Sequence, residues 1–592
     1  MEQVNQQEYV IAVVGAGPRG TSFLERLLAQ VQRSSPGQRR PLRVNVFDPA
    51  PHGPGKVWHP EQSPLYLMNT PASYPTAAPA GQTQEKLPAS SCSLSFMDYC
   101  RANALNEDAA TYPARAAYGT YLAWLSKEAS AHLRGRGVTV DHISAEVTQL
   151  SRRSNGYLLT AAGRDYRADA VILALGHLEA EQGSGPSHLA AQAERLGLHY
   201  QGPAIPTDVD YERFGAGEKV LVRGMGLNFF DLMIQVTAGR GGRFRHDPEA
   251  PPGHRLSYTA SGREPQLIAG SRRGTPYRAK TTAPGFVPEG IKLRHLTEEA
   301  VQRLVDAHGE LDFTEHLWPL IQQDVTTTYA QFGGAGEFDA QSFARPFTER
   351  HWSSPEEYQQ SMIEWLEHDA ATAAAGAGSP EKMAVNALHA ARLIIKRLVT
   401  ERLIRPESRL RDVEGWFEAL VEGLTSGPPL QRMEELAALA RAGIVEFLGP
   451  EPVYGVDSTQ RAFIADSAVV QGARYAAEHM IEAMMPPNRI TEAISPLVRG
   501  LLQQGLAVPA VMEAGGQSHV HKGFEVTEQP HRLLHSDGTS GQIYALGLQL
   551  SSAQWGTAIA AEAGGDPQTT ARTLDDADAA ALAVLQQAGG ED

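Results

Sequence analysis

The feature that most constrains this fold is a glycine-rich turn near the N-terminus, with the sequence GAGPRG at positions 15–20. The apolar, largely β-branched run 9–14 before it predicts a buried parallel strand, and the amphipathic segment 21–31 after it predicts a helix. In such a turn the first glycine permits the bend, the second lets backbone approach a pyrophosphate, and the third lets helix and strand pack closely. The phosphates then lie at the positive end of the helix. The candidate pyrophosphate-binding residues are Gly15, Gly17, Pro18, Arg19 and Gly20.

An acidic residue supports this interpretation. A second apolar run, residues 42–47, ends at Asp48, the position that binds a ribose hydroxyl in dinucleotide-binding domains. Asp48 lies further from the glycines than the usual ~20 residues, and the polar loop 34–41 accounts for the difference. A glycine-rich turn without a ligand is the alternative. The combination of strand, turn, helix and acid favours bound FAD.

Length and composition set the broad class. The 592 residues are enough for about two to four domains. A formal charge of -16 argues against a nucleic-acid partner. The two cysteines, Cys92 and Cys100, lack metal-ligand spacing, and no run approaches the ~20 apolar residues of a membrane span. The polar start of the chain also lacks a signal-peptide core. We therefore expect a cytoplasmic protein without a metal site, a nucleic-acid partner or a membrane span.

Two loops carry candidate ligand-side groups. The segment 49–60 is rich in glycine and proline and is expected at the carboxyl edge of the sheet, where ligands bind in open α/β folds. The run 65–72 places the amide of Asn69 and the hydroxyl of Thr70 beside apolar residues, which suits the edge of a flavin ring. A capped turn is the alternative for Asn69.

Three further positions complete the expected FAD site. Arg115 precedes a predicted helix and is a candidate for binding a carboxylate or phosphate, with a solvated surface arginine as the alternative. Val147 ends the predicted strand 138–147. Gly176 ends the next apolar strand, where a dinucleotide-binding sheet passes closely beneath its ligand.

A second glycine motif follows the predicted strand 219–223. Its candidate nucleotide-binding residues are Gly224, Gly226 and Asn228. Phe229 replaces the third small residue of the motif. We expect its bulk to push the helix away from the strand and to weaken close binding of a nicotinamide dinucleotide.

The strand after this motif, residues 266–270, runs directly into Ser271, Arg272 and Arg273. A hydroxyl and two guanidinium groups at the end of such a strand suit a 2′-phosphate and favour NADPH over NADH. A basic surface turn is the alternative.

The order of these motifs resembles the flavoproteins with two dinucleotide-binding domains. The pattern becomes helical from residue 295 and returns to β spacing after 442; the strand 541–547 ends at Gly547, and Leu548 stands where many of these flavoproteins have an acid near the ribityl chain. We predict an α/β fold with two Rossmann-like dinucleotide-binding domains, the FAD domain discontinuous, plus a helical domain. The expected parts are a first FAD-binding segment (8–200), an NADPH-binding domain (201–294), a helical or lid domain (295–441), a returning FAD-binding segment (442–563) and a C-terminal tail (564–592).

Several longer motifs indicate which family of flavoproteins the chain resembles. They are VVGAGPRG, VWHP followed by LMNTPA, PARxxYGxY, GMGLNFFD, SGREP and SRRGxPYR. Together they resemble a bacterial FAD/NAD(P)-binding family that includes the nitrosuccinate-forming aspartate N-monooxygenases of natural-product pathways. The stretch with Lys56, Trp58 and His59, followed by Met68 and Asn69, is also similar to the WHP and MQ elements of ornithine and lysine N-hydroxylases. This resemblance implies that the loop lies beside the flavin.

The family resemblance implies a mechanism. NADPH would reduce FAD, oxygen would add as a C4a-hydroperoxyflavin, and an amine would attack its distal oxygen. The protein then excludes water and positions the amine, so no catalytic nucleophile is expected. Catalytic residues stay unassigned, with Trp58, His59 and Asn69 as flavin-side candidates.

The implied substrate is a small acidic amino acid, L-aspartate, oxidised at its amine to the N-hydroxy, nitroso or nitro level as nitrosuccinate. The alternatives are a flavoprotein oxidase or NAD(P)H dehydrogenase without oxygen insertion, and a non-catalytic dinucleotide-binding protein. A homo-oligomer is left open.

Two substrate carboxylates in a dry pocket need cationic partners. The chain after the second dinucleotide strand is dense in cations, and the candidate substrate-binding group is Arg278, Lys280, Lys292 and Arg294. A solvated charged loop leading into the helical domain is the alternative.

Overall fold

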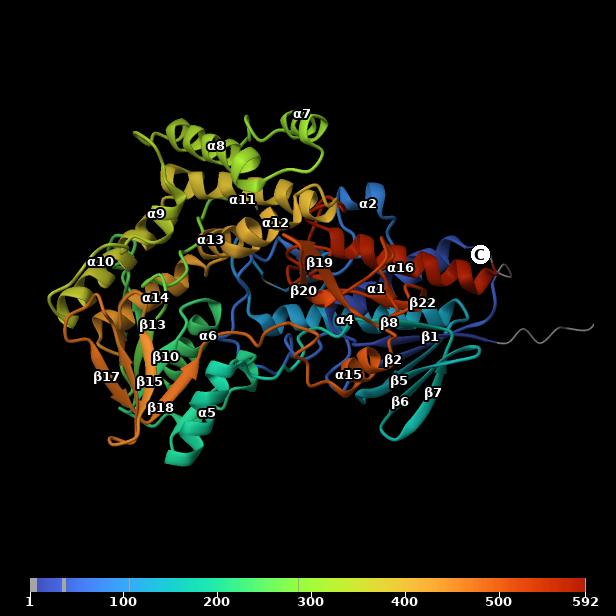
Figure 1. Cartoon of the computed structure of the whole chain (residues 1–592), viewed down its shortest axis with the longest axis horizontal. Helices are drawn as coiled ribbons and strands as arrows, with labels where there is room; N and C mark the ends of the chain where they lie inside the picture. The colour runs from blue at the N-terminus through green and yellow to red at the C-terminus, as the bar shows by residue number, and fades with distance from the viewer. Residues whose placement is uncertain (1–7, 35–38, 106, 286, 591–592) are drawn as a thin grey trace, which may run out of the picture. The chain divides into compact units, whose positions relative to one another are not determined.

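The computed structural model describes residues 8–34, 39–105, 107–285 and 287–590. The chain forms two compact units, which can be followed by colour along the sequence in Figure 1. Unit 1 holds the chain up to Glu181, the short stretch Lys396–Glu401 and the segment from Pro487 onwards. Unit 2 holds Gln182–Ile395 and Arg402–Pro486. Unit 1 is therefore discontinuous in sequence, as expected.

Unit 1 is built on a six-stranded sheet in the order β21-β22-β8-β1-β2-β4. All neighbours are parallel except β21, which pairs antiparallel with β22 at one edge. The strands are β1 (Tyr9–Val14), β2 (Leu42–Phe47), β4 (Thr139–Ile143), β8 (Ala170–Leu173), β21 (Arg532–Leu534) and β22 (Ser540–Ala545).

Both faces of this sheet are buried. Ile11 and Val13 of β1 lie in a core formed with α1 (Pro18–Arg33), α4 (Arg115–Gly135) and α16 (Arg572–Gly589). Ala12 and Val14 lie in a second core, formed with α15 (Pro496–Gln503) and the antiparallel sheet β5-β6-β7. A strand that is covered on both sides needs apolar residues at every position, which explains the continuous apolar run in the sequence.

Smaller elements complete unit 1. They are β3 (Pro75–Thr76), α2 (Thr83–Lys86), α3 (Phe96–Ala102), β5 (Val147–Arg153), β6 (Gly156–Ala161), β7 (Arg164–Ala168), β19 (Pro509–Ala514), β20 (Gln517–Phe524) and β23 (Ala561–Glu562).

Unit 2 is built on a five-stranded parallel sheet in the order β14-β13-β10-β18-β9. The strands are β9 (His199–Gln201), β10 (Lys219–Arg223), β13 (Gln266–Gly270), β14 (Val445–Phe447) and β18 (His479–Glu482). One face packs on α6 (Leu227–Val236), α10 (Pro355–Ala374) and α14 (Leu430–Arg441). The other face packs on α5 (Ser184–Leu196) and the antiparallel sheet β15-β16-β17.

The remaining elements of unit 2 are β11 (Arg243–His246), β12 (Leu256–Thr259), α7 (Glu298–His308), α8 (Trp318–Gln331), α9 (Ala340–Ala344), α12 (Pro406–Ser408), α13 (Glu418–Thr425), β15 (Val453–Asp457), β16 (Ala462–Asp466) and β17 (Arg474–Ala477). Helix α11 (Pro380–Thr400) begins in unit 2, and its last turn is assigned to unit 1.

The structure corrects the expected boundaries. β9 pairs with β18, so the first segment of unit 1 ends at Glu181 rather than at residue 200. β14 and β18 complete the sheet of unit 2, so the chain returns to unit 1 at Pro487 rather than at residue 442.

The expected helical segment does not form a compact unit of its own. Residues 295–441 are largely helical, but apart from Lys396–Glu401 they fall within unit 2, where α10 and α14 cover its sheet. In the tail, α16 packs on α1 in the core of unit 1. Across the described part of the chain, the helices are too short or too polar to cross a membrane.

Candidate functional site

The first glycine turn leaves no room for side chains at two positions. Gly15 has φ +100°, and a Cβ there would lie 2.1 Å from the carbonyl oxygen of Ala174, just past the end of β8. A Cβ on Gly20 would lie 2.1 Å from the carbonyl oxygen of Gly15. Gly17 is the N-cap of α1, and no side chain caps this helix. The first amides of α1 are therefore available to an anion.

The predicted acid is tied to this turn. Asp48 Oδ2 accepts a hydrogen bond from the amide of Ala16 at 2.7 Å, and its Oδ1 accepts one from Ala50 at 2.8 Å. Burial raises the pKa of Asp48, and the two backbone amides oppose that rise. Each carboxylate oxygen retains capacity for a second hydrogen bond, which a ribose hydroxyl can supply.

The loop 49–60 lies directly over the turn. The Gly53 amide donates to the carbonyl oxygen of Ala16 at 2.7 Å, and a Cβ on Gly55 would lie 2.9 Å from the Cα of Gly17. The loop therefore lies at the carboxyl edge of the first sheet, where it was expected.

The two expected flavin-side loops meet at the start of α4. Trp58 packs edge-on against Tyr118 at 5.0 Å, and its carbonyl oxygen occupies the space that a Cβ on Gly119 would need. The Met68 amide donates to Pro113 at 2.8 Å, while Arg115 Nε donates to the carbonyl oxygen of Leu67 at 3.1 Å. Asn69 and Thr70 follow in a half-buried bend.

Two candidates in these loops have other roles. His59 Nδ1 accepts the amide of Glu61 at 3.1 Å, which stabilises a local turn and favours a structural histidine. Lys56 is exposed, with its Nζ 3.5 Å from Glu179 Oε1. Val147 is buried at the start of β5 rather than at the end of a strand.

Gly176 follows β8 and Gly547 follows β22, which is the parallel neighbour of β8, so both glycines lie at the carboxyl edge of the first sheet. Gln549, which sequence reasoning missed, donates from Nε2 to the carbonyl oxygen of Gly176 at 2.9 Å. Arg19 donates to the carbonyl oxygens of Thr557 and Ile559, and a Cβ on Gly547 would lie 3.1 Å from its Cγ. Arg19 thus joins the first helix to the returning segment.

An acceptor at this edge fits a bound cofactor. Gln549 Oε1 is buried and has no hydrogen-bond partner among the described residues. A buried acceptor of this kind is costly unless a donor reaches it. The glycine cradle, the Asp48 carboxylate and this acceptor together fit FAD, which carries both a pyrophosphate and hydroxyl donors.

The second glycine turn repeats the geometry with a different third position. Gly224 has φ +111°, and a Cβ there would lie 3.0 Å from the carbonyl oxygen of Ala483. Phe229 is fully buried in the core shared with α10 and α14, and α6 still begins after Gly226 without a side-chain cap. The core accommodates the bulk of Phe229, so the uncapped helix N-terminus is retained.

The basic end of β13 lies beside this turn. The ring of Tyr277 is 3.5 Å from the position of a Cβ on Gly226, and the guanidinium of Arg273 lies 4.9 Å from the centre of the same ring. Ser271 Oγ donates to the carbonyl oxygen of Thr275 at 3.0 Å, and Arg272 is exposed. Arg273 thus reaches the second glycine turn through Tyr277. Tyr277 belongs to the SRRGxPYR motif but was not predicted as a site residue.

Asn228 has a structural contact, because its Nδ2 donates to the carbonyl oxygen of Ala204 at 3.2 Å. This bond ties the start of α6 to the segment after β9.

The expected substrate group does not assemble as predicted. Arg278 is buried, its Nη1 donates to Asp369 at 2.8 Å, and Lys382 Nζ contacts the same oxygen at 2.8 Å. This buried pairing uses the charge of Arg278, so its assignment to substrate is corrected. Lys292 and Arg294 are exposed.

Lys280 is the member of the group with unusual electrostatics. Burial, and then the positive field of Arg392, lower the pKa of its ammonium to about 7. A negatively charged ligand would raise that pKa again, because an opposite charge favours the ammonium form. In the described residues we find no cluster of His, Cys, Asp and Glu arranged to hold a metal ion.

Each unit thus pairs a parallel sheet with a glycine turn and an uncapped helix, which defines a protein with two dinucleotide-binding domains. The sequence profile of an FAD-NAD(P)-binding family matches residues 12–178. An L-aspartate N-monooxygenase (nitrosuccinate-forming) from Streptomyces cremeus is 34% identical, with 97% of this chain and 94% of that protein covered. A nitrosuccinic acid synthase from Aspergillus oryzae is 32% identical, with 98% and 93% covered.

A second L-aspartate N-monooxygenase, from Streptomyces davaonensis, is 31% identical, with 98% of this chain and 97% of that protein covered. The chain belongs to the flavin-dependent N-monooxygenase family that includes the nitrosuccinate-forming L-aspartate N-monooxygenases. FAD and a nicotinamide dinucleotide are the cofactors of this family.

Proposed function

We propose that this protein uses NADPH and oxygen to oxidise the amine of L-aspartate to nitrosuccinate, with FAD as the bound cofactor. The observation that carries the proposal is the intact first glycine turn, joined to Asp48, in a chain that matches aspartate N-monooxygenases over nearly its full length.

The residues proposed to hold FAD lie in unit 1. The helix amides after Gly17 bind the pyrophosphate, Asp48 binds the ribose, and Gln549 Oε1 accepts a hydrogen bond from the remainder of the cofactor. Bound FAD supplies the transfer of electrons from NADPH to oxygen and the delivery of oxygen to the amine.

The remaining flavin-side candidates line the same edge. Trp58, Met68 and Arg115 are held together at the start of α4, and we propose that they border the flavin and keep water from it. Asn69 and Thr70 remain the proposed hydrogen-bonding groups of that bend.

The substrate chemistry sets two requirements. The two carboxylates of aspartate need cations when water is excluded, and the amine must be neutral to react. We propose Lys280 as one carboxylate partner, because a bound carboxylate would favour its ammonium form, whose pKa burial and the field of Arg392 lower to about 7.

A product assay tests the proposal. Purified protein is supplied with NADPH, oxygen and L-aspartate, and NADPH consumption, peroxide release and nitrite from product breakdown are measured together. We expect NADPH consumption well above peroxide release with aspartate and little coupling with ornithine or lysine. Peroxide as the only product would instead identify an oxidase, and a colourless, inactive protein would identify a non-catalytic dinucleotide binder.

The cellular location is a separate proposal. Both cysteines are buried and free, as expected of a chain that folds in a reducing compartment, and we propose the cytoplasm. Fractionation of cells that express a tagged chain would test it.

A further inference from the structure

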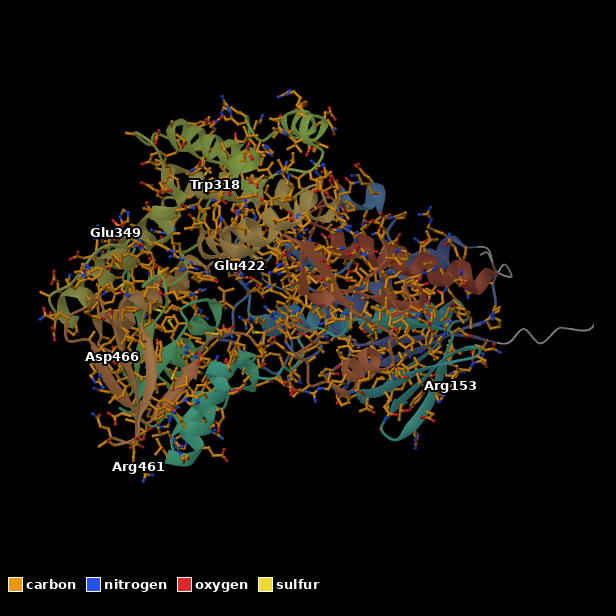
Figure 2. The ribbon with its side chains drawn as sticks, viewed as in Figure 1. Arg153, Trp318, Glu349, Glu422, Arg461 and Asp466 are labelled. Atoms are coloured by element: carbon orange, nitrogen blue, oxygen red, sulfur yellow. The ribbon has the colours of Figure 1, made fainter. Side chains whose placement is uncertain are left out.

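The end of β13 gathers more positive charge than its two adjacent arginines supply. Burial lowers the pKa of Arg273, and the fields of Arg345 and Arg272 lower it further, while Tyr277 and Glu422 act in the opposite direction. Arg345 comes from a different part of the sequence, directly after α9. Arg345 and Arg272 therefore both lie within electrostatic reach of Arg273, and the carboxylate that opposes them is that of Glu422 on α13, which is labelled in Figure 2.

The buried Arg278 explains how Arg345 reaches this place. Its Nη2 donates to the carbonyl oxygen of Phe343 at 2.7 Å, and its guanidinium lies 3.5 Å from the centre of the Phe343 ring. Asp369 holds the other side of the same guanidinium. Arg278 therefore fixes the last turn of α9 close to the chain that follows β13, and Arg345 is the next residue after that turn.

A glycine inside a helix makes room for Arg273. A Cβ on Gly423, within α13, would lie 1.7 Å from Arg273 Nη1. Glycine is less favourable than alanine inside a helix. The absence of a side chain at this position is therefore explained by the guanidinium that fills the space.

We propose that Arg345 is the third arginine that binds the 2′-phosphate of NADPH, together with Arg272 and Arg273. This inference rests on the proposed NADPH-dependent function and adds a residue to its cofactor site. The single carboxylate of Glu422 does not offset three guanidinium groups, so a further anion would be stabilised among them. A phosphate monoester carries about -1.5 to -2 charges and three acceptor oxygens, which match several guanidinium groups. NADH has no such group.

The test is a calorimetric titration of the FAD-loaded protein with 2′,5′-ADP, and with 5′-AMP as the probe that lacks the 2′-phosphate. The variant is Arg345→Gln. The matched control is Arg350→Gln, which makes the same charge change at an exposed arginine of the same connecting segment, stacked on Phe347. Because Arg345 is exposed, we expect Arg345→Gln to weaken 2′,5′-ADP binding by about three- to tenfold.

Binding of 5′-AMP should change by less than about twofold in Arg345→Gln, and Arg350→Gln should bind both nucleotides as the parent does. Arg345→Lys should recover part of the loss, because it keeps the charge without the planar fork. Equal affinities for 2′,5′-ADP in the two glutamine variants, or equal losses for both nucleotides, would overturn the proposal.

A second variant tests the same pocket without removing a charge. Gly423→Ala should displace the Arg273 guanidinium and weaken 2′,5′-ADP binding while the melting temperature stays the same or rises, since alanine favours the helix. Unchanged binding in Gly423→Ala would contradict the arrangement of the cluster. None of these titrations needs oxygen or aspartate, so failure of the proposed monooxygenase activity would appear separately, as a missing N-oxidised product with the titrations unaffected.

Discussion

The two glycine turns share their spacing and differ at one position. In unit 1 the third residue is Gly20, where any Cβ would lie 2.1 Å from the carbonyl oxygen of Gly15. In unit 2 the third residue is Phe229, which is fully buried in the core beneath the sheet. The third position of the motif therefore packs on the backbone of its own turn in one unit and fills the core beneath the sheet in the other.

The surroundings of the two turns differ in charge as well. Asp48 bonds directly to the first turn, whereas Arg273 reaches the second turn through Tyr277. A buried acid suits ribose hydroxyls, and guanidinium groups suit a phosphate. The difference supports the proposed division of work, in which unit 1 binds FAD and unit 2 binds the phosphorylated dinucleotide.

The largest expected effect comes from adding a side chain at the first glycine of the first turn. Gly15→Ala combines a positive φ with a Cβ 2.1 Å from the backbone oxygen of Ala174. Side-chain movement cannot relieve this clash, so the backbone after β8 must move. We expect loss of bound FAD and a clear fall in melting temperature. Gly163→Ala is the control, because Gly163 also has a positive φ but has open space around its Cβ position. If both variants keep flavin equally well, the close approach at Gly15 is not what the turn requires.

Gly17→Ala separates the cofactor from the fold. Gly17 has an ordinary φ of -72°, and its Cβ would lie 3.8 Å from Gly55, a normal contact. The apoprotein should therefore fold normally, while FAD binding weakens because the pyrophosphate needs this close approach. Flavin content and melting temperature measured on the same preparation check this prediction. Full flavin content in Gly17→Ala would remove the turn from the FAD site.

Replacing the arginines at the end of β13 should affect only one cofactor. A guanidinium–phosphate hydrogen bond contributes about 1.5–3 kcal/mol, or roughly ten- to a hundredfold in binding. We expect the double variant Arg272→Gln with Arg273→Gln to raise the apparent KM for NADPH by about that factor and to leave the KM for NADH nearly unchanged. Steady-state kinetics with both cofactors give the answer, and a parallel loss with NADH would point to a general basic turn.

The smallest expected effect is the pH dependence of stability that comes from His142 in unit 1. His142 Nδ1 lies 2.6 Å from His52 Nδ1, and burial, with His52 and Arg134 adding to it, lowers the pKa of His142 to about 4. The unfolded chain takes up this proton near pH 6.5, whereas the folded chain does so only near pH 4. Stability from this group is therefore present above about pH 6.5 and is lost as the pH falls toward 4.

His142→Gln should therefore flatten the fall in melting temperature between pH 7 and pH 5. The effect is modest, because the imidazole is partly in contact with solvent. Thermal unfolding at the two pH values measures it. An unchanged pH response in the variant would show that other groups dominate the acid sensitivity of unit 1.

The local features of the site could be predicted from the sequence because strand, turn and helix follow one another directly. Gly15, Gly20 and Asp48 needed only that context. The burial of Phe229 could not be predicted, because the core in which it packs includes α10 and α14 from much later in the chain. Arg278 was misassigned for the same reason, since its partner Asp369 lies 91 residues away.

The unit boundaries were wrong for a different physical reason. Short apolar strands such as β14 and β18 carry no signal for the neighbour they will pair with. The spacing after residue 442 predicted a strand at β14 but none at β18, and only the observed register assigns β14 to β13 and β18 to β10.

The division of work between the two turns is tested most directly by an anaerobic titration with NADPH, followed in the visible spectrum, of the parent protein and of Gly226→Ala. A Cβ on Gly226 would lie 3.5 Å from the Tyr277 ring, an ordinary contact, so the substitution should leave the fold intact and hinder only a ligand that approaches the second turn closely. We predict that the parent is purified yellow and is bleached by about one equivalent of NADPH, since FAD takes up one hydride. Gly226→Ala should be equally yellow and reach the same one-equivalent end point, but should be bleached more slowly at the same NADPH concentration. Loss of the yellow colour in Gly226→Ala, or bleaching at the same rate as in the parent, would contradict the account.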